Sequence, residues 1–179
     1  MKKIIFIAAI GLAYLFYSCN TPAPSNATAG GMDTASINRM KNLNVEFYQG
    51  FEKGDFSLFD TSNVMPNVID HGMGPKDVIG IDSVKKGLST MTSEIKDIKF
   101  EILAQGIDGN YSMVYNRITG TSASPASGFP VGTAIDMLNI DVLRWDNGKV
   151  AEHWGYIDPR DMMKMMPPSS MPMEDKTKH

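Results

Sequence analysis

The feature that most constrains the fold is a change in the spacing of apolar residues near Asp97. Before this point apolar residues recur at near-helical intervals, as they do at Ile37, Met40, Leu43, Phe47 and Phe51. After it, apolar and polar residues alternate, as in the series Ile98, Phe100, Ile102 and Ala104, which is typical of β-strands. Helices followed by a run of strands predict an α+β fold.

The sequence divides this fold into a short series of elements. We expect a helix that begins at Asp33 and ends at Gly54, and another that begins at Gly80. The expected strands contain residues 98–104, 111–121, 133–145 and 149–157, and a short helix follows over 159–166. Turn residues at 108–110 and 146–148 favour consecutive antiparallel hairpins. Residues 61–75, which contain Pro and Gly, are expected to be a loop or an edge strand.

The N-terminus has the pattern of a secretory signal. Lys2 and Lys3 precede an apolar run, Ile4–Phe16, and Ser18 precedes Cys19. The run of about 13 residues is shorter than the roughly 20 that span a bilayer as a helix. Residues 16–19 resemble the lipobox of bacterial lipoproteins, which implies that Cys19 is lipidated. An uncleaved anchor and a generic secretory signal are the alternatives.

These features predict the organisation and location of the chain. We expect a lipoprotein signal peptide over 1–18, a flexible tether over 19–32, a folded domain over 33–166 and a disordered tail over 167–179. Lipidation of Cys19 would anchor the domain to a membrane of the bacterial cell envelope, in the periplasm or at the surface. Cys19 is the only cysteine, so the chain forms no internal disulfide.

Composition excludes several classes of function. The net charge is −3 and Lys and Arg do not cluster, which argues against a nucleic-acid partner. No phosphate-binding or dinucleotide-binding motif occurs, so we expect no cofactor. His71, His153 and His179 lack metal-ligand spacing, so we expect no metal. An alternative is Cu(I) at the C-terminal methionines, although these also suit the apolar side of a short helix.

A family resemblance runs from about residue 36 to residue 167. The second half resembles SnoaL-like polyketide and ester cyclases through these segments: Gly120-Thr121, Gly128-Phe129-Pro130, Asp141-Val142-Leu143-Arg144, Gly148-Lys149-Val150, Glu152, Trp154 and Asp158. In the first half, Phe47-Tyr48, Gly54-Asp55 and Asp70-His71 fall in the expected order. The resemblance implies a nuclear-transport-factor-2-like cone, in which helices pack on a curved antiparallel sheet and enclose a pocket.

The resemblance also implies catalytic and binding residues. Such cyclases catalyse an intramolecular aldol condensation without a metal or cofactor, and the implied general acid/base is Asp158, assisted by His71. A raised pKa in an apolar pocket would suit Asp158 to this role. The substrate-binding residues expected from the resemblance are Trp154, Tyr156, Arg117 and Tyr48. The simpler alternatives are an N-cap at Asp158, since Pro159 follows, and a surface ion pair at Arg117.

The alternation expected in the last strand predicts which of these residues share a face of the sheet. On an ideal strand Trp154, Tyr156 and Asp158 share one face, and His153 lies on the other. With Asp158 facing the pocket, Trp154 would form an apolar wall beside it. His153 would then point away from the pocket unless a bulge re-aims it.

The function that the resemblance implies is broad. We expect a pocket for a small apolar molecule with a carbonyl group, and acid/base chemistry of the cyclase, isomerase or hydrolase type. The alternative is a non-catalytic module that binds a small ligand or another protein. A homodimer formed through the open sheet face is also expected, as in relatives. The export signal argues against a substrate that is made inside the cell.

Overall fold

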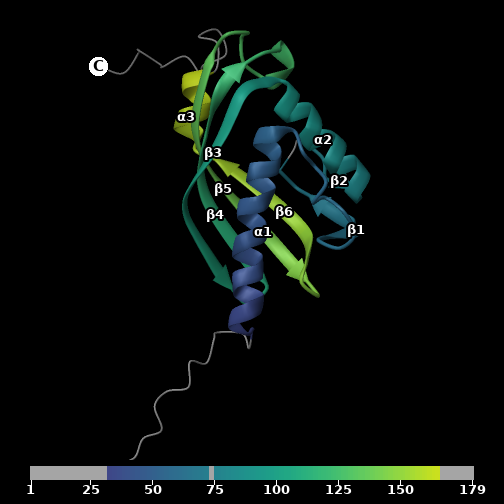
Figure 1. The fold of residues 1–179 in the computed structure, drawn as a ribbon. Helices are drawn as coiled ribbons and strands as arrows, with labels where there is room; N and C mark the ends of the chain where they lie inside the picture. Colours follow the sequence, from purple (N-terminus) through teal and green to yellow (C-terminus); the bar gives the residue numbers. More distant parts are fainter. Residues whose placement is uncertain (1–31, 73–74, 166–179) are drawn as a thin grey trace, which may run out of the picture.

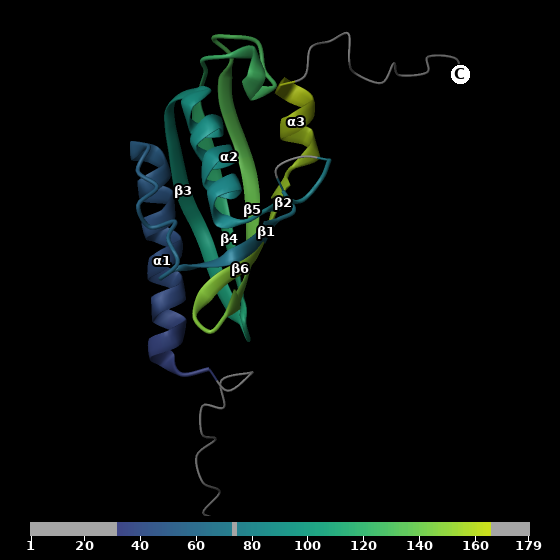
Figure 2. The same ribbon diagram turned by 90° about the vertical axis from the view of Figure 1, so that its right-hand side faces the viewer.

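The computed structural model describes residues 32–72 and 75–165. These residues form one curved sheet of six strands in the order β2-β1-β6-β5-β4-β3. Helices α1 and α2 pack on one face of the sheet, and the short α3 lies on the other side, as the two views show (Figures 1 and 2).

The elements follow the expected order along the chain. Their bounds are α1 Thr34–Lys53, β1 Val64–Asp70, β2 Val78–Ile79, α2 Ile81–Ser93, β3 Ile95–Asp108, β4 Tyr111–Ser122, a 3-10 turn at Pro125–Ser127, β5 Ala134–Asp146, β6 Lys149–Ile157 and α3 Pro159–Met165. Strands β3 to β6 pair as consecutive antiparallel hairpins, as predicted. The predicted α+β class is confirmed.

One part of the sheet differs from the prediction. Residues 64–70 form β1, which pairs in parallel with β6 and antiparallel with β2. The sheet is therefore mixed rather than antiparallel, and β1 is an internal strand. The segment was hard to assign because Pro66 interrupts its alternation.

Helix α1 is fixed at both ends by local chemistry. Asp33 caps its start by accepting a hydrogen bond from the Ser36 amide at 2.6 Å. Gly54 ends it in a left-handed conformation with a φ of 66°. Between these ends, Met40, Leu43 and Phe47 are buried at helical spacing against the sheet.

Burial alternates along the strands and distinguishes two faces of the sheet. In β4, Ser112, Val114, Asn116 and Ile118 are buried, whereas Tyr111, Met113, Tyr115 and Arg117 are exposed. We call the face beneath α1 and α2 the inner face and the opposite one the outer face. Trp145 anchors the inner face near the β5–β6 turn, where its indole donates a hydrogen bond to Ser112 Oγ at 2.9 Å.

The predicted signal peptide, Cys19, almost all of the tether and the tail lie outside the described residues. Among the residues that are described, no helix is both long enough and apolar enough to cross a membrane.

Candidate active site

A cavity of about 200 Å³ lies between the inner face of the sheet and helices α1 and α2. Most of its wall is apolar, formed by Phe47, Phe51, Phe59, Val68, Val84, Leu88, Met91, Phe100, Ile118, Met137, Leu143, Val150 and Ile157. Its polar side chains come from α1, β1, β5 and β6, and are Asn44, Tyr48, Asp70, Asn139, Asp141 and His153. An apolar cavity with a few convergent polar groups is the usual form of a small-molecule site.

The polar side chains centre on His153, which lies between two carboxylates. Its Nδ1 is 3.1 Å from Asp70 Oδ2, and its Nε2 is 3.0 Å from Asp141 Oδ1. The sheet produces this arrangement because β1 and β5 flank β6. Asp70 is directly opposite His153 in the parallel ladder, and Asp141 is opposite Gly155, two residues further along.

Each carboxylate has further hydrogen-bond donors. Asp70 is 1% exposed, and its Oδ1 accepts a hydrogen bond from the Gly72 amide at 2.8 Å. Asp141 Oδ2 accepts hydrogen bonds from the Tyr48 hydroxyl and from Asn116 Nδ2, the latter at 2.9 Å. Asn116 Nδ2 also lies 3.1 Å from the Tyr48 oxygen. Buried charges are tolerated when they are paired and hydrogen-bonded in this way.

His153 and Asp141 determine each other's charge. Burial alone lowers the pKa of His153, but hydrogen bonds to Asp141 and Asp70 and the charges of these two groups outweigh it and raise that pKa to about 10. Burial alone raises the pKa of Asp141, but the hydrogen bond and charge of His153, with hydrogen bonds from Tyr48 and Asn139, hold it below its usual value. At neutral pH the pair is therefore an imidazolium and a carboxylate.

Tyr48 interacts with the negative charge of Asp141 through a hydrogen bond. Burial is the largest cause that raises the pKa of its hydroxyl, and the negative charge of Asp141 adds to it. The hydroxyl therefore stays protonated and acts as a donor to Asp141. Tyr48, expected to contact substrate, does line the cavity.

Asp158, expected to be the general acid/base, is not among the residues that line the cavity. Its Oδ1 accepts a hydrogen bond from the Arg160 amide at 2.9 Å, which caps the start of α3, and its Oδ2 pairs with the Arg160 guanidinium at 2.7 Å. These side-chain and backbone bonds to Arg160 lower the pKa of Asp158 to about 2. The expectation of a raised pKa is wrong, and the N-cap is what the structure shows.

His71, Trp154 and Tyr156 lie on the outer face. The His71 and Trp154 rings stack with centroids 4.8 Å apart and planes 16° apart. His71 Nδ1 contacts Asp77 Oδ1 at 2.9 Å, and its Nε2 contacts Glu152 Oε2 at 3.3 Å. None of His71, Trp154 and Tyr156 lines the cavity.

The prediction divided β6 into its two faces correctly but assigned the wrong face to the pocket. His153, Gly155 and Ile157 line the cavity, so the expectation that His153 points away from it is wrong. The misleading signal was the resemblance that placed Asp158 in the pocket, because Trp154 shares a face with Asp158 on an ideal strand. The face is set instead by the register of β6 with its neighbours, which places His153 beside the buried Asp70.

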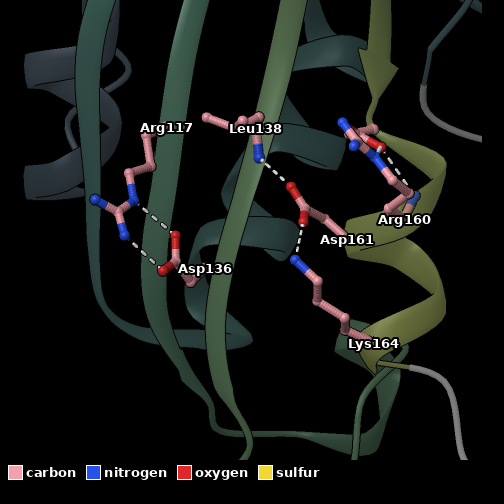
Figure 3. A network of polar contacts seen from close by, with 7 residues as sticks. Arg117, Asp136, Leu138, Arg160, Asp161 and Lys164 are labelled. Atoms are coloured by element: carbon pink, nitrogen blue, oxygen red, sulfur yellow. Dashed lines mark hydrogen bonds and ion pairs between the residues drawn. The ribbon is translucent and has the colours of Figure 1, made fainter.

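Arg117 does not reach the cavity either. It forms a two-pronged ion pair with Asp136 on the neighbouring strand, at 2.7 and 2.6 Å, on the exposed outer face (Figure 3). The same view shows Asp161 of α3 between the Leu138 amide and Lys164 (Figure 3). The hydrogen bond from the Leu138 amide to Asp161 attaches α3 to β5. Arg117 is therefore the surface ion pair that the sequence left open as an alternative.

Of the residues in the hydrogen-bonded cluster around His153, four were not predicted as site residues: Asp70, Asn116, Asp141 and His153 itself. Asn44 and Asn139 of the cavity wall were not predicted either. For Asn116 and Asp141 a signal was present in the strand alternation. Asn116 shares the buried face of β4 with Val114 and Ile118, and Asp141 shares the inner face of β5 with Met137, Leu143 and Trp145. A polar residue in an otherwise apolar inward series is a candidate for function, because its burial is costly.

The described part of the chain contains no group of three or more His, Cys, Asp or Glu side chains that could hold a metal ion. The chemistry available at the cavity wall is that of an acid and a base in hydrogen-bond contact. Such a pair can move a proton on a molecule that is bound beside it.

Comparison with solved structures places the fold among known proteins. TsrD from Streptomyces laurentii superposes with a TM-score of 0.63 at 19% identity, over 75% of this chain and 96% of that one. A SnoaL-like polyketide cyclase from Jannaschia superposes with a TM-score of 0.62 at 17% identity, over 78% and 95%. An LEH-like epoxide hydrolase of Mycobacterium tuberculosis gives 0.55 at 17%, over 74% and 90%. These likenesses show the fold.

The family follows from the sequence match. No curated protein matches the chain significantly. The family model described as SnoaL-like polyketide cyclase matches residues 42–165, which include every polar residue of the cavity wall. The chain therefore belongs to the SnoaL-like polyketide cyclase family.

Proposed function

We propose that this chain is an envelope lipoprotein whose cavity binds a small, largely apolar molecule with a carbonyl group and transfers a proton on it without a cofactor. The observation that carries the proposal is the ion pair of Asp141 and His153 in an otherwise apolar cavity. A carboxylate is a base and an imidazolium is an acid, so the pair has both parts of general acid–base catalysis.

Substrate binding would activate the base. A carbonyl oxygen beside His153 accepts the Nε2 hydrogen that Asp141 Oδ1 accepts in the unliganded site. Asp141 then loses the partner that contributes most to its lowered pKa, and becomes a stronger base. It takes a proton from the carbon next to the carbonyl. The electrons of that C–H bond form an enolate, whose negative oxygen faces the imidazolium.

The later steps define the reaction type. In a cyclase the enolate carbon attacks a second carbonyl of the same molecule, and the proton on Asp141 goes to the new alkoxide. In an isomerase the proton returns to a different carbon. Asp70 has both oxygens occupied and is almost inaccessible, so it is a positioning residue that holds His153 in place.

Proton exchange tests this proposal without knowledge of the natural substrate. Cyclohexanone in D2O exchanges its α-hydrogens, and NMR measures the rate with and without the protein. We expect the wild-type protein to accelerate exchange and Asp141→Asn to lower this effect by about 10²- to 10⁴-fold. Asp158→Asn is the control and keeps the wild-type rate. Loss of exchange in Asp158→Asn but not in Asp141→Asn would refute the assignment.

Hydrolysis of an epoxide is a second candidate. The imidazolium is an acid at neutral pH, which suits protonation of an epoxide oxygen while Asp141 takes a proton from the attacking water. The likeness to an LEH-like epoxide hydrolase favours this reaction over other hydrolyses. Cyclohexene oxide is the test substrate, and diol formation that depends on both His153 and Asp141 is the expected result.

A binding module without catalysis is the outcome if neither reaction is accelerated. Cyclohexanone would then still perturb the NMR signals of the cavity residues, and Asp141→Asn would change affinity without changing any rate.

The lipid anchor is supported by the sequence of the first 19 residues. Cys19→Ala is expected to move the protein from the membrane fraction to the soluble fraction of the producing cell. Labelling with a radioactive fatty acid should mark the wild-type protein and leave the variant unlabelled. A labelled Cys19→Ala protein would contradict lipidation at this residue.

We propose a second copy of the chain as the partner of the outer face. Tyr115, Ile140 and Tyr156 lie opposite one another on β4, β5 and β6, and Tyr156 is 58% exposed. The arginines of this face, Arg117 and Arg144, are already paired within the chain, which leaves an apolar centre that is suited to self-association.

Light scattering tests this dimer. The wild-type protein should have the mass of two chains, and Ile140→Asp should have the mass of one. Val131→Asp is the control, since Val131 is 62% exposed in the loop between β4 and β5. A wild-type monomer would contradict the proposal.

A further inference from the structure

Gly155 occupies an unusual position for a glycine. It lies inside β6 and lines the cavity, on the same face as His153 and Ile157. Its backbone is not in the left-handed region, so its conformation does not require glycine. Glycine inside a strand weakens the strand and often marks a place where a ligand or another backbone approaches closely.

The space above Gly155 is bordered by the groups of the cavity wall. A methyl carbon at this position would lie 3.6 Å from Asp141 Oδ1, 3.7 Å from His153 Cε1 and 4.0 Å from Asn139 Oδ1. These are ordinary van der Waals distances. The site therefore has room for one methyl group next to the acid and the base, and an alanine would fit without displacing any neighbour.

A neighbouring backbone does not explain the glycine. Gly72, at the end of β1, does face such a constraint, because a methyl carbon on it would lie 2.7 Å from the Gly155 nitrogen. That contact requires glycine at position 72. No atom of residue 72 is among the three nearest to the space above Gly155. Gly155 is part of the cavity wall, so a ligand can pack against its Cα at this place.

We infer that the hydrogen-bearing atom of the substrate occupies the space above Gly155, and that Gly155 is a specificity-determining residue. This inference rests on the proposed function. Two of the three bordering atoms are acceptor oxygens, so the occupant presents a hydrogen to them: an acidic C–H beside a carbonyl, or an O–H.

The hydrogen-bond pattern of Asp141 supports this placement. Its Oδ2 receives hydrogen bonds from Tyr48 and Asn116, and its Oδ1 receives one from His153. In the proposed reaction the substrate carbonyl takes the His153 hydrogen away from Oδ1, and Oδ1 is the oxygen that borders the space. The substrate class that follows is a neutral molecule with an acidic hydrogen. A carboxylate would bring its oxygens against those of Asp141 and Asn139.

The test compares two alanine variants of the full chain. Gly155→Ala fills the space, and Gly106→Ala is the control, since Gly106 lies inside β3 with no atom within 4 Å of the added methyl. The probes are cyclohexanone and cyclohexanecarboxylate, titrated by NMR while the Gly155 amide signal is followed. The same samples are used to measure α-hydrogen exchange of cyclohexanone and the melting temperature.

We expect cyclohexanone to shift the Gly155 signal and cyclohexanecarboxylate to leave it unchanged. Gly155→Ala should weaken cyclohexanone binding at least 10-fold and keep a melting temperature no lower than that of Gly106→Ala. Gly106→Ala should bind within twofold of wild type. Equal binding by both variants, no shift at Gly155 in the wild type, or a lower melting temperature for Gly155→Ala would overturn the inference.

The two proposals fail in different ways. If Gly155→Ala weakens cyclohexanone binding but the wild-type protein does not accelerate α-hydrogen exchange, the placement above Gly155 stands and catalysis is refuted. If Gly155→Ala exchanges the α-hydrogens of cyclohexanone as fast as the wild type does, catalysis stands and the placement of the substrate above Gly155 is refuted.

Discussion

Two histidines lie between pairs of carboxylates, one on each side of the sheet. On the inner face His153 lies between Asp70 and Asp141, and on the outer face His71 lies between Asp77 and Glu152. The two imidazoles are equally exposed, at 23% each. Their partners differ, because Asp70 is 1% exposed whereas Asp77 is 53% exposed.

The inner cluster is the more deeply buried of the two, and its charges interact more strongly. Burial of the ring lowers the pKa of both histidines, and hydrogen bonds with the carboxylates outweigh this in both. The pKa of His153 nevertheless rises to about 10, whereas that of His71 is raised less. Charges that are screened by water interact weakly, and charges with buried partners interact strongly. His153, Asp70 and Asp141 also line the cavity, whereas His71, Asp77 and Glu152 do not.

The largest expected effect is the loss of stability when His153 is replaced, and replacement of His71 is the matched comparison. His153→Gln leaves two carboxylates close together without a cation, and we expect it to lower the free energy of unfolding by about 3–5 kcal/mol. The matched variant His71→Gln should lower it by less than about 1 kcal/mol, because Asp77 is exposed to water and Glu152 keeps its pair with Arg144. Urea unfolding measures both. Equal losses would mean that the two clusters do not differ in strength.

The next largest effect should be a difference between the His153 and His71 clusters in how they make stability depend on pH. The folded-state pKa of His153 lies above its ordinary value of 6.5, so the stability it contributes is full below pH 6.5 and is lost as pH rises to about 10. In this range the free energy of unfolding should fall by about 1.4 kcal/mol per pH unit from this group. The pKa of Asp141 is lowered, so its contribution is present above pH 3.8 and is lost as acid protonates it.

Unfolding measured from pH 6.5 to pH 10 checks this slope. His153→Gln should abolish the slope, and His71→Gln should retain most of it because the pKa of His71 is raised less. A wild-type protein with flat stability over this range would contradict a charged His153.

The smallest expected effect concerns Asp158, whose ion pair with Arg160 lies outside the cavity. Asp158→Ala removes the cap of α3 and should lower the urea midpoint by less than His153→Gln does. Its α-hydrogen exchange rate should equal that of the wild type. Loss of α-hydrogen exchange in Asp158→Ala would mean that Asp158 takes part in catalysis.

The sequence predicted the parts of this molecule that depend on local pattern. Helix α1 followed from its cap at Asp33 and its apolar spacing, and β4 to β6 followed from alternation between turns. The division of β6 into two faces was also correct. These features depend on neighbours within a few residues of one another.

The candidate site could not be predicted because it depends on pairing between distant strands. Asp70 reaches His153 only through the parallel pairing of β1 with β6, which joins segments more than 80 residues apart. Trp154 was taken as a pocket wall because it shares a strand face with Asp158, which the resemblance placed in the pocket, yet it stacks on His71 outside the cavity. Which face of β6 lines the cavity depends on its register with β1 and β5, and no local pattern contains that information.

The most direct test of this account is the titration of both histidines by nitrogen NMR of their imidazole rings. His153→Gln and His71→Gln assign the signals. We expect His153 to stay protonated until about pH 10 and His71 to lose its proton at a lower pH. A His153 that titrates at or below 6.5 would be neutral at physiological pH, and the acid–base pair at the centre of the proposed function would not exist.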